Sequence, residues 1–132
     1  MKAMNIFMLV LALCLVGGCK GSSNDESDRL FADMSANLRE MSAILTSVTD
    51  EASAQAAVPR IEAVREKMRD CARRAREMPR PDAATEQRLN EDMQKLMAEV
   101  MPEIASAQAR LAERPELMAI IAPAMQGMEN DL

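Results

Sequence analysis

Three long runs of this sequence repeat apolar residues at every third or fourth position, and this period constrains the fold more than any other feature. Apolar side chains at that spacing form one stripe along an α-helix, which must be buried against another element. The spacings of the first run, 3, 4, 3, 4 and 3, are typical of a coiled coil. Its members are Phe31, Met34, Leu38, Met41, Leu45 and Val48. The stripe leaves Asp33, Asn37, Arg39 and Ser47 on other sides of the helix, away from the core. The pattern predicts an all-α protein.

Two further long runs and one short run follow. The second run contains Ala54, Ala57, Ile61, Val64, Met68, Cys71, Ala75 and Met78. The third has a mean spacing close to that of a straight helix and contains Leu89, Met93, Leu96, Val100, Ile104, Ala107 and Leu111. The short run contains Leu117, Ile120, Ile121, Ala124 and Met128. We therefore expect an antiparallel three-helix up-down bundle, capped by a short fourth helix at the C-terminus.

Residues that favour helix starts separate these runs. Ser23 and Glu26 have the spacing of a capping box, so the first long helix should begin close to them. Thr49-Asp50-Glu51 supplies a cap and first-turn acids for the second helix. Asp82 follows a proline-rich turn and can cap the third, and Pro115 suits the first turn of the fourth.

Two prolines lie inside the predicted helices. Pro59 interrupts the second run and Pro102 the third, and an interior proline costs a helix about 3 kcal/mol. Because the apolar spacing continues across Pro59, we interpret it as a bend within one helix. A short helix over 50–57, followed by a separate helix from Pro59, is the alternative.

The first nineteen residues have the pattern of an export signal that ends in a cysteine. Lys2 is basic, Ile6 to Val16 form an apolar run too short to span a bilayer, and Val16-Gly17-Gly18-Cys19 completes the segment. This arrangement resembles the lipobox of bacterial lipoproteins. The resemblance implies a signal-peptide helix over 1–18, cleavage after Gly18, and fatty acids such as palmitate attached to Cys19.

This resemblance divides the chain and gives it a location. Residues 1–18 would be the signal peptide, 19–26 the lipidated cysteine and a flexible tether, 27–128 the helical bundle, and 129–132 a tail. The protein would be lipid-anchored in the bacterial cell envelope, facing the periplasm or the exterior. In lipoproteins an aspartate after the cysteine commonly retains the product at the inner membrane, so Lys20 slightly favours the outer membrane.

Composition restricts the partners and the chemistry. Removing Lys2 with the signal peptide changes the net charge from −5 to −6, which argues against nucleic acid as a partner. The sequence contains no histidine, tryptophan or tyrosine, so the core must be aliphatic and thioether. After processing, Cys71 has no intramolecular partner, and we expect it to be a small buried hydrophobic residue; an intermolecular disulfide or a reactive thiol is the alternative.

Methionine is abundant, with 13 residues in the chain. Met93, Met97 and Met101 have the spacing i, i+4, i+8 on one helical face, and thioethers at such spacing can bind Cu(I). Methionine also fills irregular gaps in a core without aromatics, and we favour this structural interpretation over a metal site.

The end of the second predicted helix is basic. Residues 60–80 contain eight basic and four acidic side chains, and Arg73, Arg74, Arg76 and Arg80 should lie near the anchored end of the bundle. There each basic side chain could contribute about 1 kcal/mol of attraction to anionic headgroups. A solvated outer face with helix ion pairs is the alternative.

The sequence therefore favours a noncatalytic protein without a cofactor. Cys71 lacks the histidine base that nucleophilic catalysis needs, and no glycine-rich phosphate loop is present. Residues 27–128 also resemble small exported helical proteins whose roles are uncharacterised, and this resemblance implies no activity. We expect a scaffold or interaction module whose partners are membrane lipid, through Cys19, and an envelope protein or a second copy. A periplasmic protein that binds a small ligand or Cu(I) through its methionine-rich face is the alternative.

Overall fold

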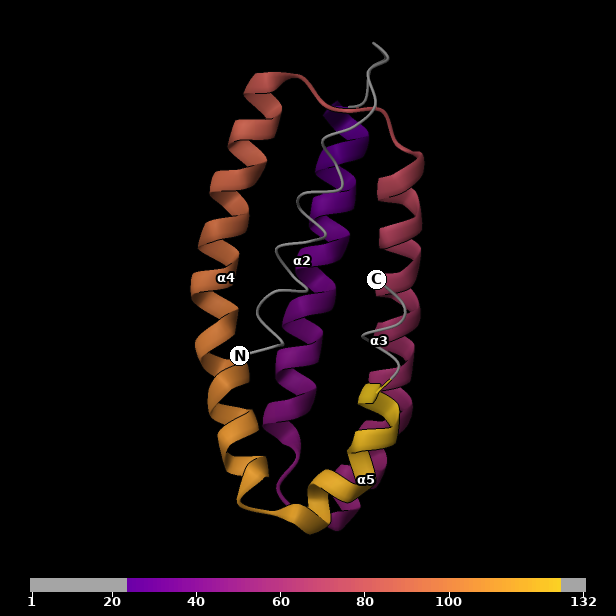
Figure 1. Cartoon of the computed structure of the whole chain (residues 1–132), viewed down its shortest axis with the longest axis vertical. Helices are drawn as coiled ribbons and strands as arrows, with labels where there is room; N and C mark the ends of the chain where they lie inside the picture. The colour runs from indigo at the N-terminus through magenta and orange to yellow at the C-terminus, as the bar shows by residue number, and fades with distance from the viewer. Residues whose placement is uncertain (1–23, 127–132) are drawn as a thin grey trace.

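The computed structural model describes residues 24–126, which form α-helices and no strand (Figure 1). The elements are α2 (Asn24–Ser47), α3 (Glu51–Glu77), α4 (Ala83–Ala112) and α5 (Pro115–Met125). The all-α class and the helical bundle are confirmed. The predicted signal-peptide helix over 1–18, Met128 and the tail over 129–132 lie outside the described residues.

The predicted caps form at the starts of α3 and α4, and α5 begins with the predicted proline. The carboxylate of Asp50 accepts a hydrogen bond from the backbone N–H of Ser53, and the hydroxyl of Ser53 accepts one from the N–H of Asp50, which completes a capping box. Asp82 caps α4 by accepting from the N–H of Thr85, and α5 has Pro115 in its first turn. The capping box expected at Ser23 lies outside the described residues, and α2 is described from Asn24.

Both interior prolines lie within continuous helices. Pro59 is part of α3 and Pro102 is part of α4, so the alternative of a break before Pro59 is wrong. Both side chains are exposed, and on an exposed face water can hydrogen-bond the carbonyl that the proline ring leaves unpaired.

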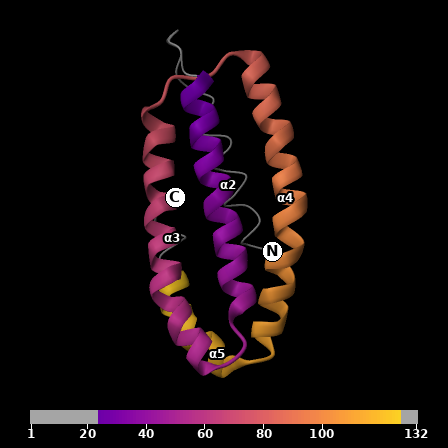
Figure 2. The ribbon, with the colours of Figure 1, turned by 180° about the vertical axis from the view of Figure 1, so that it is seen from behind.

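Helix α2 is the centre of the bundle. It packs against both α3 and α4, which lie on either side of it and whose backbones scarcely approach each other (Figures 1 and 2). Helix α5 packs mainly on α3 and also touches α4, at the end of the bundle where α3 begins. We call this the far end, and the end at Asn24 the near end. Of the described helices, four meet at the far end and three at the near end.

The cross-helix contacts follow a different order along each of the two interfaces of α2. Along the interface with α3 the partner numbers fall as the α2 numbers rise, since Ser27 meets Met78 and Glu40 meets Lys67. Along the interface with α4 the residue numbers of both helices rise together. The successive pairs are Asp28 with Arg88, Arg39 with Glu99, and Ser42 with Glu103.

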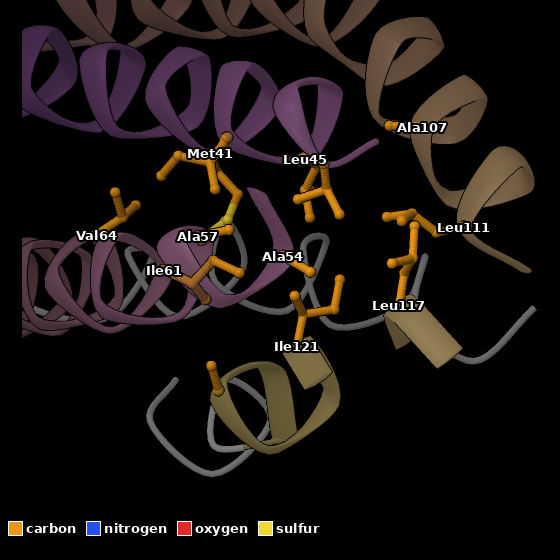
Figure 3. Close-up of a cluster of buried hydrophobic side chains, with 13 residues drawn as sticks. Met41, Leu45, Ala54, Ala57, Ile61, Val64, Ala107, Leu111, Leu117 and Ile121 are labelled. Atoms are coloured by element: carbon orange, nitrogen blue, oxygen red, sulfur yellow. The ribbon is translucent and has the colours of Figure 1, made fainter. Parts of the chain in front are cut away.

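The apolar core consists of two clusters. The far-end core, in which all four helices take part, is shown in Figure 3 and comprises Met41, Ile44, Leu45, Val48, Ala54, Ala57, Ile61, Val64, Ala107, Leu111, Leu117, Ile121 and Ala124. The near-end core has only Leu38, Leu96 and Val100 fully buried. Half-buried side chains, among them Phe31, Met68 and Met93, pack against it. Most of the buried apolar contact is therefore at the far end.

The central position of α2 gives it a wider buried face than its apolar stripe predicts. Ile44 and Ser42 are buried although neither belongs to the stripe, and Asn37, expected outside it, is only 5% exposed. The side-chain amide of Asn37 donates a hydrogen bond to the Sγ of Cys71 at 3.6 Å. A helix that contacts two neighbours buries two sides, so the prediction that Asn37 lies away from the core is wrong.

Among the described residues, the buried side chains extend from Ser27 to Ala124. In this part of the chain, no helix has an apolar stretch long enough to cross a membrane.

Candidate functional site

The predicted lipidation and cleavage residues, Cys19 and Gly18, lie outside the described residues. The chain enters the described structure at Asn24, whose side-chain amide donates to the carboxylate of Asp82 at 2.7 Å. Asp82 also caps α4, and the N–H of Thr85 lowers the pKa of its carboxyl group. The start of α2 is therefore held beside the link between α3 and α4.

The four arginines predicted to meet a membrane surface lie at this near end. Arg73, Arg74 and Arg76 belong to the last two turns of α3, and Arg80 lies in the link to α4. The C-terminus of α3 is favourable for cations, because the last carbonyl groups of a helix carry partial negative charge. The structure thus brings the predicted basic residues to one end of the bundle.

Three of these arginines form ion pairs. Arg73 is bound by Asp70 and Glu77 on its own helix, and both carboxylates raise its pKa. Arg74 reaches Asp33 of α2 at 2.6 Å, and Arg80 makes two contacts of 3.0 Å with Glu86 of α4. The pairs with Asp33 and Glu86 join helices, so part of the arginine charge holds the near end together.

The methionine set predicted on α4 does not act as one group. Met93 is half-buried against the near-end core, Met97 is half-buried, and Met101 is 39% exposed. Each step of four residues advances the direction around the helix by about 40°. Across two steps Met101 therefore turns away from the side that Met93 occupies.

A small cavity lies at the near end, between α2, the end of α3 and α4. Its volume is about 150 Å³, and its main lining is apolar. The apolar lining comprises Leu30, Phe31, Met34, Met78, Leu89 and Met93. Sequence reasoning grouped Met93 with Met97 and Met101 and did not connect it with Met34 or Met78. The convergence of these three residues depends on how the helices align.

A second and broader hollow, of about 760 Å³, runs between α2 and α4. Arg39 and Glu99 line it and form a two-contact ion pair, with distances of 3.0 and 3.1 Å. This pairing lowers the pKa of Glu99. Glu103 accepts from the hydroxyl of buried Ser42 at 2.9 Å. The carboxylates of Glu99 and Glu103 therefore bind partners across the interface between α2 and α4, which is a structural role.

Cys71 is buried, and burial is the main reason why its thiol pKa is raised. A raised pKa keeps the thiol protonated at neutral pH, and the protonated form is a poor nucleophile. Its position fits the prediction of a small buried hydrophobic residue.

Between residues 24 and 126, no three His, Cys, Asp or Glu side chains are placed to hold a metal ion together. Comparisons of the chain with protein-family models, with curated proteins and with solved structures give no match.

Proposed function

We propose that this protein is a bacterial lipoprotein, anchored through Cys19 in the cell envelope, whose helical bundle is a noncatalytic scaffold or interaction module. The observation that carries the proposal is the segment Val16-Gly17-Gly18-Cys19 after an apolar run. Cysteines carrying two or three acyl chains remain on a membrane, since each buried methylene contributes about 0.8 kcal/mol. Lys20 favours the outer membrane as the site.

The bundle that this anchor would hold is a three-helix up-down arrangement with a short fourth helix. The opposite order of contacts between α2 and α3, and the shared order between α2 and α4, support this topology. Only four residues lie between Cys19 and Asn24, so the five steps from one to the other span at most about 18 Å. The near end would therefore lie close to the lipid surface, with the far end and α5 directed away from it.

The ion pairs of the described surface support a noncatalytic role. The acidic side chains of the broad hollow face arginine or serine partners, and the single described thiol is buried with a raised pKa. Neither arrangement provides the base and exposed nucleophile that covalent catalysis needs. Interaction with an envelope protein or with a second copy is the role that remains for the exposed helical faces.

Metabolic labelling with a palmitate analogue tests the anchor. The chain is expressed in a bacterium, and the incorporated label is compared between the unaltered chain, Cys19→Ser and the matched control Cys71→Ser. We expect label in the unaltered chain and in Cys71→Ser, and none in Cys19→Ser. Label that persists in Cys19→Ser, or no label in any of the three, would reject lipidation at this cysteine.

Contact between the basic end of α3 and anionic headgroups is a separate part of the proposal. The triple variant Arg73→Glu, Arg74→Glu, Arg76→Glu should weaken binding of the unlipidated domain to vesicles that contain anionic lipid, and Arg60→Glu, toward the far end, should have a smaller effect. Co-sedimentation at low and high salt measures both. Equal binding by the triple variant and the unaltered domain would show that these arginines serve the ion pairs alone.

Crosslinking on intact cells tests the interaction role. A scaffold should give reproducible crosslinks to one envelope protein or to its own copies, located on exposed faces such as that of α5. If crosslinking under conditions that capture other envelope complexes gives only monomer, the role as an interaction module would be wrong, while the anchor would stand.

A further inference from the structure

The near-end cavity brings together three thioether side chains from three different helices. Met34 comes from α2, Met93 from α4, and Met78 is the residue that caps the C-terminus of α3. All three are half-buried. This set differs from the sequence-predicted face of α4, because Met97 and Met101 do not line the cavity.

The position of these side chains is not explained by core packing alone. Met34 and Met78 belong to neither of the two core clusters, and the cavity that they border lies between α2, the end of α3 and the start of α4. Methionine that merely fills a core gap removes empty space. Here a volume of about 150 Å³ remains between the side chains.

A buried hydroxyl group is directed at one of the sulfurs. Ser27 is 3% exposed, lines the same cavity, and donates a hydrogen bond to the Sδ of Met78 at 3.8 Å. A thioether is a weak acceptor, so this is an unusual partner for a buried serine. The contact places a hydroxyl oxygen beside the thioether group, within a lining that is mainly apolar.

Thioether sulfur is a soft ligand, and soft ligands select Cu(I) and similar monovalent ions over Mg²⁺ or Ca²⁺. The pair of Arg80 and Glu86 also lines the cavity, so its charged groups balance each other. Methionine has three rotatable side-chain bonds, which allows the sulfurs to converge on an ion smaller than the cavity. We propose that Met34, Met78 and Met93 bind one soft monovalent cation of the Cu(I) class.

Titration with Ag(I), a soft monovalent ion that is stable in air, tests this site. The protein is the full chain with Cys14→Ser, Cys19→Ser and Cys71→Ser, because each thiol would compete for the ion. Calorimetry should show one saturable equivalent of Ag(I), and the thermal midpoint should rise with the free ion concentration. Competition with a chromophoric chelator gives the corresponding Cu(I) affinity under reducing conditions.

Single Met→Leu variants locate the ligands. Leucine is close to methionine in volume, so each variant should fold, with less than about 1.5 kcal/mol lost. Met34→Leu, Met78→Leu and Met93→Leu should each weaken Ag(I) binding by about tenfold or more, which corresponds to about 1.4 kcal/mol. The matched controls Met101→Leu and Met118→Leu, whose side chains are exposed, should change it by less than about twofold.

Absence of a saturable equivalent would overturn the proposal. So would equal losses in the cavity variants and the exposed controls, which would indicate adventitious binding by methionines in general. If one cavity variant fails to fold, the methyl resonances of the unaltered protein decide the question. On adding Ag(I), the signals of Met34, Met78 and Met93 should shift together while that of Met118 stays in place.

Discussion

Ile61 is the residue at which the architecture of the far-end core can be tested most severely. Its side chain is fully buried, with 0% exposure, in a cluster to which α2, α3, α4 and α5 all contribute. Shortening a buried isoleucine to alanine costs about 2–5 kcal/mol, and the cost is highest where the surroundings cannot collapse into the space. Because side chains from four helices surround this cluster, we expect Ile61→Ala to lose about 3–4 kcal/mol.

Urea denaturation followed by far-ultraviolet circular dichroism measures this loss, because the chain has no tryptophan or tyrosine to report by fluorescence. With an m-value of about 1.5 kcal/mol/M, the expected loss lowers the urea midpoint by about 2 M. The matched control is Ile120→Ala, at a half-buried position on α5 that packs against the same cluster. It should lose only about 1 kcal/mol, because less apolar surface returns to water.

The difference in stability loss between Ile61→Ala and Ile120→Ala tests the packing of the far-end core. A loss below about 1 kcal/mol for Ile61→Ala, or equal losses in both variants at equal m-values, would mean that α3 does not bury this side chain as described. It would then follow that the far end is not a shared four-helix core.

Three further predictions concern the helix ends and the buried thiol. The guanidinium of Arg110 donates to the carbonyl oxygens of Leu45, Thr46 and Val48, at 3.3, 3.0 and 3.5 Å, so Arg110→Met should lower the free energy of unfolding by about 1 kcal/mol in urea titration. The backbone N–H of Ser53 holds the pKa of the Asp50 carboxyl below its ordinary 3.8, so the stabilisation by the ionised carboxylate is complete above that pH and is lost as the pH falls through the folded-state pKa. Thermal midpoints measured between about pH 6 and about pH 2.5 should therefore fall less steeply in Asp50→Asn than in the unaltered protein, and equal slopes would contradict this. Because Cys71 is buried and its pKa is raised, a thiol reagent should modify it at least about 100-fold faster in urea than in the folded state, as followed by absorbance.

The period of the apolar residues was sufficient to predict the helices and the residues that α3 buries. On α3, Ala54, Ala57, Ile61 and Val64 are buried as the stripe requires, and Cys71 is buried as expected. Local chemistry also predicted a cap within Thr49-Asp50-Glu51 and a cap at Asp82, because a capping contact spans only three residues and depends little on the rest of the fold.

The burial of Asn37 and Ile44 could not be obtained from the stripe of α2. A stripe shows that a helix packs, but not how many neighbours it packs against, and α2 contacts two. The cross-helix pairs, such as that of Arg74 and Asp33, depend on how the two helices align. These two residues are 41 positions apart in the sequence. For the same reason the convergence of Met34, Met78 and Met93 on one cavity emerges only from the packed helices.

The intact mass of the protein extracted from a bacterial membrane fraction tests the central claim most directly, because it reports both processing and modification. The account predicts a chain that begins at Cys19 and is heavier than residues 19–132 alone by the mass of a diacylglyceryl group, with or without a further acyl chain. An unmodified chain that retains residues 1–18 and is recovered from the soluble fraction would contradict it.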